Sequence, residues 1–526
     1  MTEAKPRRSF PSTFWVANVM ELFERGAYYG MNSVLAVYLA ASVAEGGLGF
    51  GEQSVGFLQS IVYAATYVLP ILGGALAERY GYRRMLLVAF SLLTAGYFAA
   101  GYASTYALVF LSLLVMATGS GLFKPIISGT IARTTDESNS AFGFGIYYWM
   151  INLGAFLAPL AVSVLKGFSW RHVFVASALY PGLMLLPTLF VFRDPPGVGG
   201  DDELRSERDS LAEAEPGARG VRRSTPRNKK PLREVLLGAA EVLADARFML
   251  MIVVYSGFWV LYFQTFGSVL WYLRDFVDRA PVSSAVTSLL RGLGLSWTFT
   301  FDVEHVTVIN AGTIILLQVV VSRLVKDWKA LPTMVSGMAL GAVGFLLLAS
   351  SRNPWVFILG IAVFSIGEMT AHPKYYSFVG QVAPADRKAV YMGYAFLYGV
   401  LGALLGSSLG AFLYERMLKP ALGTPEADSR ARAFWLLFAA LGVVAAAALV
   451  LFARSFGADT EDTRRRARRV MRGVYATVLL MGGFFLYVAF SSTPMQARTA
   501  VQAAIFIALG AGGLLMGAGT RPPTGR

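Results

Sequence analysis

The sequence predicts an all-α protein that crosses a membrane many times, with two bundles of six helices followed by two additional C-terminal helices. Composition is the first reason, because 55% of the 526 residues are hydrophobic and only 15% are charged, too little charge for a soluble chain of this length. The distribution of charge is the second reason: long apolar runs alternate with short basic connectors such as "ERYGYRR" and "RRRARRVMRG". The runs reach about 20 residues, the length that a membrane-spanning helix needs.

The apolar runs set the order of the expected spans. The first six are expected near residues 13–42, 53–79, 84–102, 105–131, 139–166 and 172–193. Six more are expected near 247–277, 303–324, 330–350, 354–382, 388–416 and 432–455, and the last two near 471–491 and 499–518. The basic N-terminus "MTEAKPRRSF" is not followed by a short apolar core with a small-residue cleavage site, so the first span is expected to be retained.

A long hydrophilic stretch divides the chain into parts. They are an N-terminal bundle (1–193), a linker (194–246), a C-terminal bundle (247–456), and a basic connector with the two extra helices (457–526). The linker mixes both charge signs with Pro and Gly, which is typical of a solvated tether and less so of a regulatory module. Transporters are often built from two such bundles around a site at the midplane of the membrane.

The net charge of +14 indicates orientation rather than nucleic-acid binding. Lys and Arg gather in alternate connectors, and these lie on the same side of the membrane as the basic N-terminus. By the positive-inside rule this side is the cytoplasm, so both termini are expected there, in the cell (inner) membrane. The chain has no cysteine, which excludes disulfides, thiolate metal ligands and a thiol nucleophile.

A polar stripe on the first span is the strongest functional signal. Polar residues in and just after "ELFERGAYYG" recur at helical spacing and share one face: Glu21, Glu24, Arg25, Tyr28, Tyr29 and Asn32. Each charge at the centre of a membrane costs about 2.5–3.5 kcal/mol, so these charges must be paired or face a wet cavity. A structural ion pair uses one acid and the arginine, and the second acid is then expected to accept protons.

Charged residues on other spans suggest a cavity with two walls. Lys124 lies inside "GSGLFKPIISG", too far from the end of its span for snorkelling to be the better explanation. Glu368 lies near the middle of a span in the second half. Arg25 and Lys124 therefore form a positive wall opposite the negative Glu368, an arrangement that suits a zwitterion.

Polar and aromatic residues are expected to line the same cavity. They are Tyr67, Tyr148, Asn152, Trp259, Gln264 and Asn310. Helix packing is the more common role for any one aromatic residue, and an Asn bonds a neighbouring helix about as often as it binds a ligand.

A charged turn is expected at the cytoplasmic mouth. The motif "GGALAERYGYRR" places four charged residues there, Glu78, Arg79, Arg83 and Arg84. They serve either membrane topology alone or a gate that holds one conformation, and they bind no substrate.

Taken together, these motifs resemble the proton-coupled oligopeptide transporters (POT family) of the major facilitator superfamily. "ELFERGAYYG" is similar to the family signature E-x-x-E-R-F-x-Y-Y-G, "GLFKP" to its G-x-x-K-P-N segment, and "YYWMINLGAF" to its F-Y-x-x-I-N-x-G segment. "GEMTAHPKYYSFVGQVAP" resembles the segment with the second-half glutamate, and "GGALAERYGYRR" the loop motif of the superfamily. The resemblance covers about residues 10–455.

The resemblance implies the major facilitator fold and a role for each matched residue. Those expected to couple transport to protons are Glu21, Glu24, Arg25 and Lys124. A peptide carboxylate would be held by Arg25 and Lys124, and its backbone and amino end by Asn152, Asn310 and Glu368. The residues that would line the pocket are Tyr28, Tyr29, Tyr67, Tyr148 and Trp259.

The sequence departs from the family pattern at several positions. Gly26 stands where Phe is common, Asn32 where Arg is common, and Ile126 where the family has Asn; "MGYAFLYG" lacks an expected Trp. His372 and Lys374 add basic groups near the second-half glutamate and could partly neutralise it. The loss of one cation and one amide weakens the prediction of ordinary peptide recognition.

The predicted function is import of di- or tripeptides, or similar small zwitterions, by proton symport with alternating access. The expected partners are the solute, protons and the lipid bilayer, with no nucleic acid, no cofactor, no metal and a functional monomer. Two alternatives are a proton-coupled carrier of a modified amino acid, organic anion or drug, and a membrane receptor that binds peptide without transport. An enzyme is not expected, because there are three His, no H-E-x-x-H motif and no nucleophile elbow.

Overall fold

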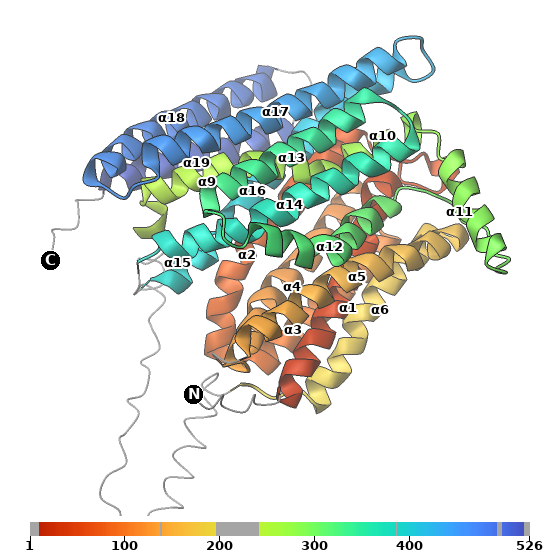
Figure 1. The fold of residues 1–526 in the computed structure, drawn as a ribbon, viewed down its shortest axis with the longest axis horizontal. Coiled ribbons are helices and arrows are strands. Elements are labelled where there is room, and N and C mark those ends of the chain that lie inside the picture. The colour runs from red at the N-terminus through yellow and green to blue at the C-terminus, as the bar shows by residue number, and fades with distance from the viewer. Residues whose placement is uncertain (1–9, 137–138, 196–240, 385–386, 492–496, 520–526) are drawn as a thin grey trace, which may run out of the picture.

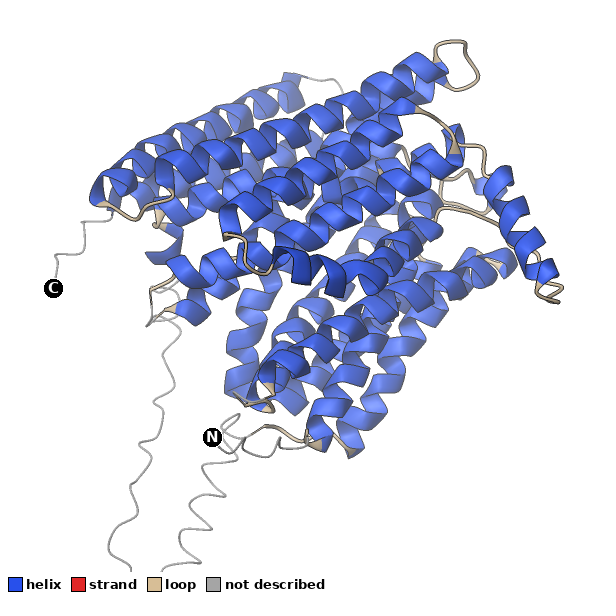
Figure 2. Ribbon diagram, viewed as in Figure 1, coloured by secondary structure: helices blue, strands red, loops and turns tan. Residues whose placement is uncertain are grey.

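The computed structural model describes residues 10–136, 139–195, 241–384, 387–491 and 497–519, and this part of the chain is helical, without strands (Figure 2). The N-terminal half consists of α1 (Ser12–Ala40), α2 (Glu52–Tyr80), α3 (Tyr82–Tyr102), α4 (Tyr106–Arg133), α5 (Ser140–Phe168) and α6 (Trp170–Phe190), with a short 3-10 turn, η1 (Val43–Glu45), after α1. The expected linker, 194–246, lies largely outside the described residues.

The C-terminal half has more elements than expected. They are α9 (Ala246–Tyr262), η2 (Phe263–Phe266), α10 (Ser268–Phe276), α11 (Ala280–Gly292), α12 (His305–Val325), α13 (Ala330–Ser350), α14 (Pro354–Val382), α15 (Lys388–Tyr394), α16 (Leu397–Leu413), η3 (Tyr414–Leu418), η4 (Lys419–Ala421) and α17 (Ala427–Phe456). The extra hairpin follows as α18 (Glu461–Ser491) and α19 (Ala497–Gly519).

The membrane spans follow the predicted pattern of six, six and two. In the described part of the chain, 13 helices are long and apolar enough to cross a membrane. The helix α1 has 29 residues but is not among them, because Glu21, Glu24 and Arg25 make its sequence more polar. With α1 included, the chain is a multi-pass membrane protein of the expected layout.

Three spans differ from their predicted forms, and one of them is the span expected at 388–416, which is divided into α15 and α16. The span expected at 247–277 is broken at Gly267, whose φ of −143° and ψ of −94° lie outside the helical region. The helix α18 begins at Glu461, ten residues before the expected start near 471, because its basic first turns are stabilised by the i,i+4 ion pairs Arg465–Glu461 and Arg466–Asp462.

The two halves meet at one end of the molecule. We call the end with η1 and α11 the outer end, and the opposite end, at which α1 begins, the inner end. In Figure 1 the helices of the two halves converge at the outer end and diverge toward the inner end. Between the halves, α2 packs against α16, α5 against α12, and α1 against η2 and α10.

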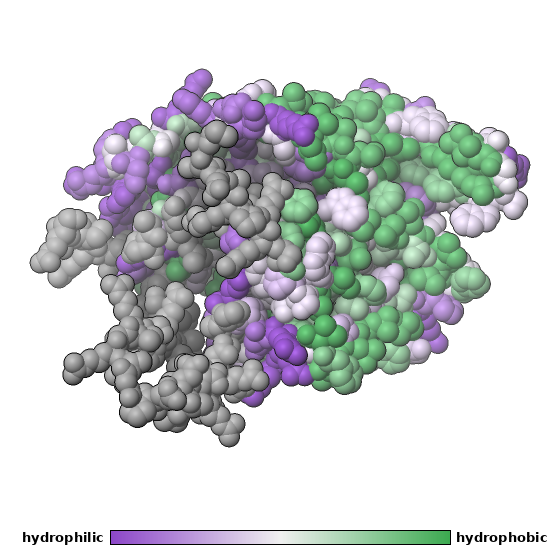
Figure 3. All heavy atoms as spheres, turned by 60° about the horizontal axis from the view of Figure 1, so that its bottom comes forward, coloured by the Kyte–Doolittle hydropathy of each residue, from purple (hydrophilic) through white to green (hydrophobic). Residues whose placement is uncertain are grey.

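The sides of the bundle are apolar. Figure 3 shows a broad hydrophobic surface over the middle and right of the view, with hydrophilic residues gathered toward the left. Large side chains of the spanning helices are strongly exposed, including Phe190 (81%), Leu316 (77%) and Leu480 (74%). Such exposure on spanning helices is expected where they face lipid.

The extra hairpin lies against the C-terminal half, where α18 contacts α9 and α17. On α19, Gln502 Nε2 donates to Ser408 Oγ of α16 at 3.1 Å. Near the start of α19, Arg498 bonds the hydroxyl of Ser54 on α2. The helix α19 therefore contacts both sides of the seam between α2 and α16.

Candidate functional site

The polar stripe of α1 faces the interior of the N-terminal half. Glu21, Glu24 and Arg25 are 2%, 0% and 7% exposed. Arg25 Nε lies 3.2 Å from Glu21 Oε1, and the same guanidinium pairs with Glu24. One arginine thus serves two acids, and the trio carries an excess negative charge when both acids are ionised.

The two acids have different neighbours. Ser120 Oγ on α4 donates to Glu24 Oε1 at 3.0 Å, whereas Tyr147 on α5 lies beside Glu21. Neither Ser120 nor Tyr147 was among the predicted site residues. The small residues of "GSG" and the first tyrosine of "YYWMIN" were the available signals, but the prediction used only the second tyrosine.

Lys124 lies on α4 and is half-buried. Its Nζ donates to the carbonyl of Thr66 at 3.3 Å and lies 5.2 Å from the ring centroid of Tyr67. Among the described residues no acid lies within ion-pair distance of it. A lysine held by a carbonyl and an aromatic ring is available to bind an anionic group of a solute.

Glu368 occupies a matching position in the C-terminal half. Its Oε2 accepts a hydrogen bond from Asn310 Nδ2 at 3.0 Å, and the same amide nitrogen lies 2.9 Å from Ser365 Oγ. Within the described ranges no cation forms an ion pair with Glu368. The amide orients the carboxylate without neutralising it.

Lys374 and His372 are engaged away from this carboxylate. Lys374 Nζ donates to the carbonyls of Lys326 (3.1 Å) and Trp328 (2.8 Å), near the end of α12. His372 Nδ1 lies 3.2 Å from the hydroxyl of Tyr255. The expectation that Lys374 adds charge to the cavity is therefore wrong, because its ammonium group caps a helix end.

Aromatic residues connect the two halves. The ring centroid of Tyr67 on α2 lies 6.4 Å from Trp259 on α9 and 6.1 Å from Tyr398 on α16. On α1, the ring centroid of Tyr29 lies 6.4 Å from that of Phe266 in η2. Aromatic contacts therefore join α1 and α2 to the C-terminal half.

Asn32 is bonded to other residues of the protein. It is fully buried; its Nδ2 donates to the Tyr28 carbonyl at 2.9 Å, and its Oδ1 accepts from the Tyr63 hydroxyl at 2.8 Å. The Tyr63 hydroxyl accepts in turn from Gln59 Nε2, which also donates to the Phe266 carbonyl at 2.8 Å. This chain of bonds ties α1 and α2 to η2, so Asn32 supports the helix break instead of facing a ligand.

Gln264 also has a packing role. It is 1% exposed, and its Nε2 donates to the carbonyls of Val260 (2.7 Å) and Gly406 (2.9 Å). Its Oε1 accepts from Ser268 Oγ at 2.7 Å. The side chain bridges the break between α9 and α10 and has no polar atom left for a ligand.

Two further predicted residues, Tyr148 and Asn152, lie on α5. Tyr148 is 36% exposed. Asn152 is 6% exposed and donates to the carbonyl of Tyr148 within α5, at 2.9 Å. Ile126, where the family has Asn, is fully buried, so this position presents no side chain to a solute.

An ion cluster closes the outer end between α5 and the segment before α12. Lys166 Nζ lies 2.5 Å from Asp302 Oδ2 and 2.6 Å from Glu304 Oε2, and Arg279 also pairs with Asp302. Burial opposes the ionisation of Asp302, but Lys166 and Arg279 outweigh it and hold the pKa of Asp302 below its ordinary value.

A second set of contacts joins α1 and α2 to the C-terminal half. Lys419 Nζ on η4 lies 2.7 Å from Glu52 Oε2 at the start of α2, and Glu415 accepts from the backbone N–H of Gln53 at 3.1 Å. Trp271 Nε1 on α10 donates to the carbonyl of Ala36 on α1 at 3.0 Å. The outer end is therefore closed.

The charged turn at the inner end is tied into the N-terminal half. Glu78 accepts from Arg133 Nη2 on α4 (2.8 Å) and from the Tyr82 hydroxyl (2.7 Å), and Arg83 Nε donates to the Thr188 carbonyl of α6 at 3.1 Å. Arg133 was not among the predicted residues. The other two predicted residues, both exposed, are Arg79 and Arg84.

Comparison with known proteins bears on the family and the fold. A profile of the Major Facilitator Superfamily matches residues 22–300 and 275–526. An uncharacterized transporter, YclF, of Bacillus subtilis is 31% identical over 187 residues, 34% of this chain and 38% of that protein. Dipeptide and tripeptide permease A of Chromobacterium violaceum is 30% identical over 205 residues, 38% of this chain and 40% of the permease. The chain thus aligns with less than half the length of these relatives.

Solved structures match over most of the chain. A peptide transporter POT in complex with sulfate has a TM-score of 0.65 at 20% identity and covers 85% of this chain and 96% of its own. A POT family transporter in complex with 5-aminolevulinic acid has a TM-score of 0.62 at 20% identity, covering 85% and 98%. At this identity the match shows the fold alone, and it confirms the predicted architecture.

Proposed function

The chain belongs to the major facilitator superfamily, and from this premise we propose that it is a proton-coupled symporter that imports di- or tripeptides or similar small zwitterions. The observation that carries the proposal is the pair of opposed charges: Lys124 without an acid partner in one half, and Glu368 without a cation partner in the other, among the described residues. Sequence similarity to curated peptide permeases over part of the chain supports it.

The charges suit the two ends of a zwitterion. A solute carboxylate binds Lys124, and Arg25 when its guanidinium is free, through charge-assisted hydrogen bonds. A solute ammonium group binds Glu368, whose other contact is the amide of Asn310. A solute that neutralises both walls removes the cost of holding unpaired charges inside the membrane.

Proton coupling acts through the shared arginine. With both acids ionised, Arg25 is held by Glu21 and Glu24. Protonation of one acid weakens that hold and frees the guanidinium for the solute. Glu24 keeps the hydroxyl of Ser120 as a donor, and in this scheme either Glu24 or Glu21 takes up the proton.

Transport requires the outer contacts to break and reform. The two halves rock about the central site, and only a difference in affinity between the two states drives the cycle. One proton charge moving through 100 mV is worth about 2.3 kcal/mol, which concentrates a solute tens-fold. We place the protein in the cytoplasmic membrane, with both termini and the inner end in the cytoplasm, as a functional monomer.

Uptake of labelled dialanine into proteoliposomes, with and without an inward proton gradient, tests the proposal. We expect gradient-dependent accumulation by the native chain and at least a tenfold loss in Lys124→Ala. Lys326→Ala is the matched control, because that lysine is exposed and, within the described residues, its ion pair is with the exposed Asp327. Uptake without a gradient response, or equal uptake by both variants, would overturn the proposal.

A second candidate is a proton-coupled carrier of a non-peptide solute. It is favoured by Asn32, which is committed to Tyr63, and by Ile126, which is buried, since both leave fewer polar groups for a peptide backbone. Competition of dialanine uptake by modified amino acids, organic anions and drugs distinguishes the two candidates. Accumulation above the outside concentration excludes a receptor that only binds.

A further inference from the structure

The extra hairpin carries basic residues that transport does not use. The first turns of α18 contain "RRRARRVMRG". Three of these arginines pair with nearby acids, as Arg464–Asp459, Arg465–Glu461 and Arg466–Asp462. Among the described residues, no acid forms an ion pair with Arg468. The side chain of Arg468 is half-buried, whereas the side chains of the three paired arginines are exposed.

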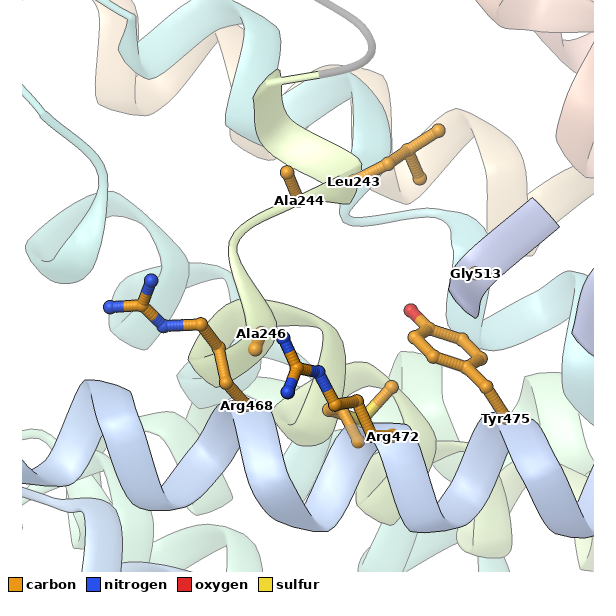
Figure 4. A pocket seen from close by; sticks show the side chains of 8 residues that line it. Leu243, Ala244, Ala246, Arg468, Arg472, Tyr475 and Gly513 are labelled. Carbon is orange, nitrogen blue, oxygen red and sulfur yellow. The ribbon is translucent and has the colours of Figure 1, made fainter. Parts of the chain in front are cut away.

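Arg468 lines a small pocket between the hairpin and the C-terminal half. The lining includes Leu243, Ala246, Arg468, Met471, Arg472 and Tyr475. Figure 4 shows Arg468, Arg472 and Tyr475 projecting from α18 toward the segment that leads into α9. Gly513 of α19 closes one side, since a Cβ there would lie 2.3 Å from the Tyr475 ring. The pocket combines two guanidinium groups with an apolar floor.

The position of the pocket along α18 corresponds to the lipid headgroup region. Leu480 and Phe484 are 74% and 64% exposed on the same helix, as expected of residues that face acyl chains. A helix rises about 1.5 Å per residue, so Arg472 lies roughly 12 Å from Leu480 along the axis. The guanidinium groups are therefore at the membrane surface on the inner side, while the rest of α18 crosses the hydrocarbon region.

We propose that this pocket binds the headgroup of one anionic phospholipid. Arginine matches the geometry of phosphate oxygens, and basic pockets between spanning helices on the cytoplasmic side bind anionic headgroups. The apolar residues Met471 and Tyr475 contact the upper acyl chain. The pocket is open and too small for a whole lipid, so the chains lie outside it along the protein surface.

Native mass spectrometry of the full-length protein tests the site. Purified protein is titrated with dioleoylphosphatidylglycerol or, as a neutral comparison, dioleoylphosphatidylcholine. We expect one retained phosphatidylglycerol, bound at least tenfold more weakly by the double variant Arg468→Gln/Arg472→Gln. The double variant Arg465→Gln/Arg466→Gln removes the same charge from the same helix and should bind like the native chain.

Two further experiments test the pocket itself and the need for acyl chains. Ala246→Trp fills the pocket without removing an arginine, and it should weaken lipid binding as the Arg468/Arg472 double variant does. Glycerol 3-phosphate, which shares the phosphate but lacks acyl chains, should not compete at equal concentration. The proposal would be overturned by equal binding of the two lipids or by equal loss of binding in the two arginine double variants. It would also be overturned if Ala246→Trp had no effect or if glycerol 3-phosphate competed.

Discussion

Arg25 is bonded to two buried acids, and this sharing determines how α1 responds to substitution. Removing one acid leaves the arginine paired with the other, so the fold tolerates the change. Removing the arginine leaves two buried carboxylates without a counter-ion. A change of this kind lowers the free energy of unfolding by about 3–5 kcal/mol. The acids are therefore better sites for functional tests than the arginine.

We expect Glu24→Gln to separate exchange from accumulation. The amide keeps the Ser120 hydrogen bond and Arg25 remains paired with Glu21, but one protonatable group is lost. Gradient-driven uptake in proteoliposomes should fall at least tenfold, while counterflow exchange of labelled solute persists. Glu45→Gln, in the exposed turn η1, is the control. Full gradient-driven uptake by both Glu24→Gln and Glu21→Gln would falsify this coupling scheme.

Asp302 gives a pH prediction with a definite sign. Its pKa in the folded protein lies below the ordinary value of 3.8, so its contribution to stability is present above that value. It is lost only as the pH falls through the lower, folded pKa. Between pH 5 and 8 we therefore expect the outer cluster to stay formed, measured as the labelling rate of a cysteine placed at Thr300. Faster labelling at pH 5 than at pH 7 would assign proton sensing to the outer end.

Sequence reasoning located the charged residues of the site better than the neutral ones. The cost of burying a charge made Glu21, Arg25, Lys124 and Glu368 conspicuous, and in the structure Glu21 pairs with Arg25 and Glu368 accepts from Asn310. Asn32 has the same helical spacing but bonds Tyr63 of another helix. Spacing assigns a face of one helix, and it does not say which neighbour covers that face.

At the level of helices, close packing between α2 and α16 fixes the seam between the halves. A Cβ at Gly56 would lie 2.3 Å from Ala411 Cβ and 2.6 Å from the Ser407 carbonyl oxygen. Both neighbours belong to α16, and a backbone carbonyl cannot rotate away. A larger residue must separate the helices, and overpacking of this kind costs about 1–3 kcal/mol.

We therefore expect Gly56→Leu to destabilise the closed outer end. The variant should melt at a lower temperature, and the distance between spin labels on the outer ends of α2 and α16 should broaden. Gly145→Leu is the matched control, since nothing lies within 4 Å of a Cβ there. An unchanged distance distribution in Gly56→Leu would show that the seam does not depend on this contact.

The spans were predictable, whereas the breaks within them were not. Hydrophobic length sets a span, and most observed bounds fall within a few residues of the expected ones. The break at Gly267 depends on Gln264, which bonds the Gly406 carbonyl of another helix, and apolar residues continue on both sides. The short helix α11 was missed because it has 13 residues, fewer than a span requires.

For the molecule as a whole, the closed outer end is the dominant conformational feature. Glu304 is fully buried, and Lys166 is its bonded cation. Loss of that lysine leaves the negative charges of Asp302 and Glu304 close together, without the positive charge that both acids share. The balance between the two end states therefore depends on one side chain of α5.

We expect Lys166→Met to favour opening of the outer end. Cysteines placed near the outer ends of α1 and α10 should react several-fold faster with a membrane-impermeant maleimide. Lys326→Met, which removes an exposed lysine paired at 3.8 Å with Asp327, should leave the rate unchanged. If both variants label at the native rate, the ion cluster does not hold the outer end closed.

The placement of α19 has a kinetic consequence. The helix is bonded to α16 through Gln502 and reaches Ser54 of α2 through Arg498, so an element of the C-terminal half rests on the N-terminal half. When the outer seam parts, that contact has to be released, and it has to reform when the seam closes. In the proposed transport cycle, the turnover time therefore includes the breaking of a contact far from the solute site, and we expect a chain that ends before α18 to cycle at a different rate with the same affinity.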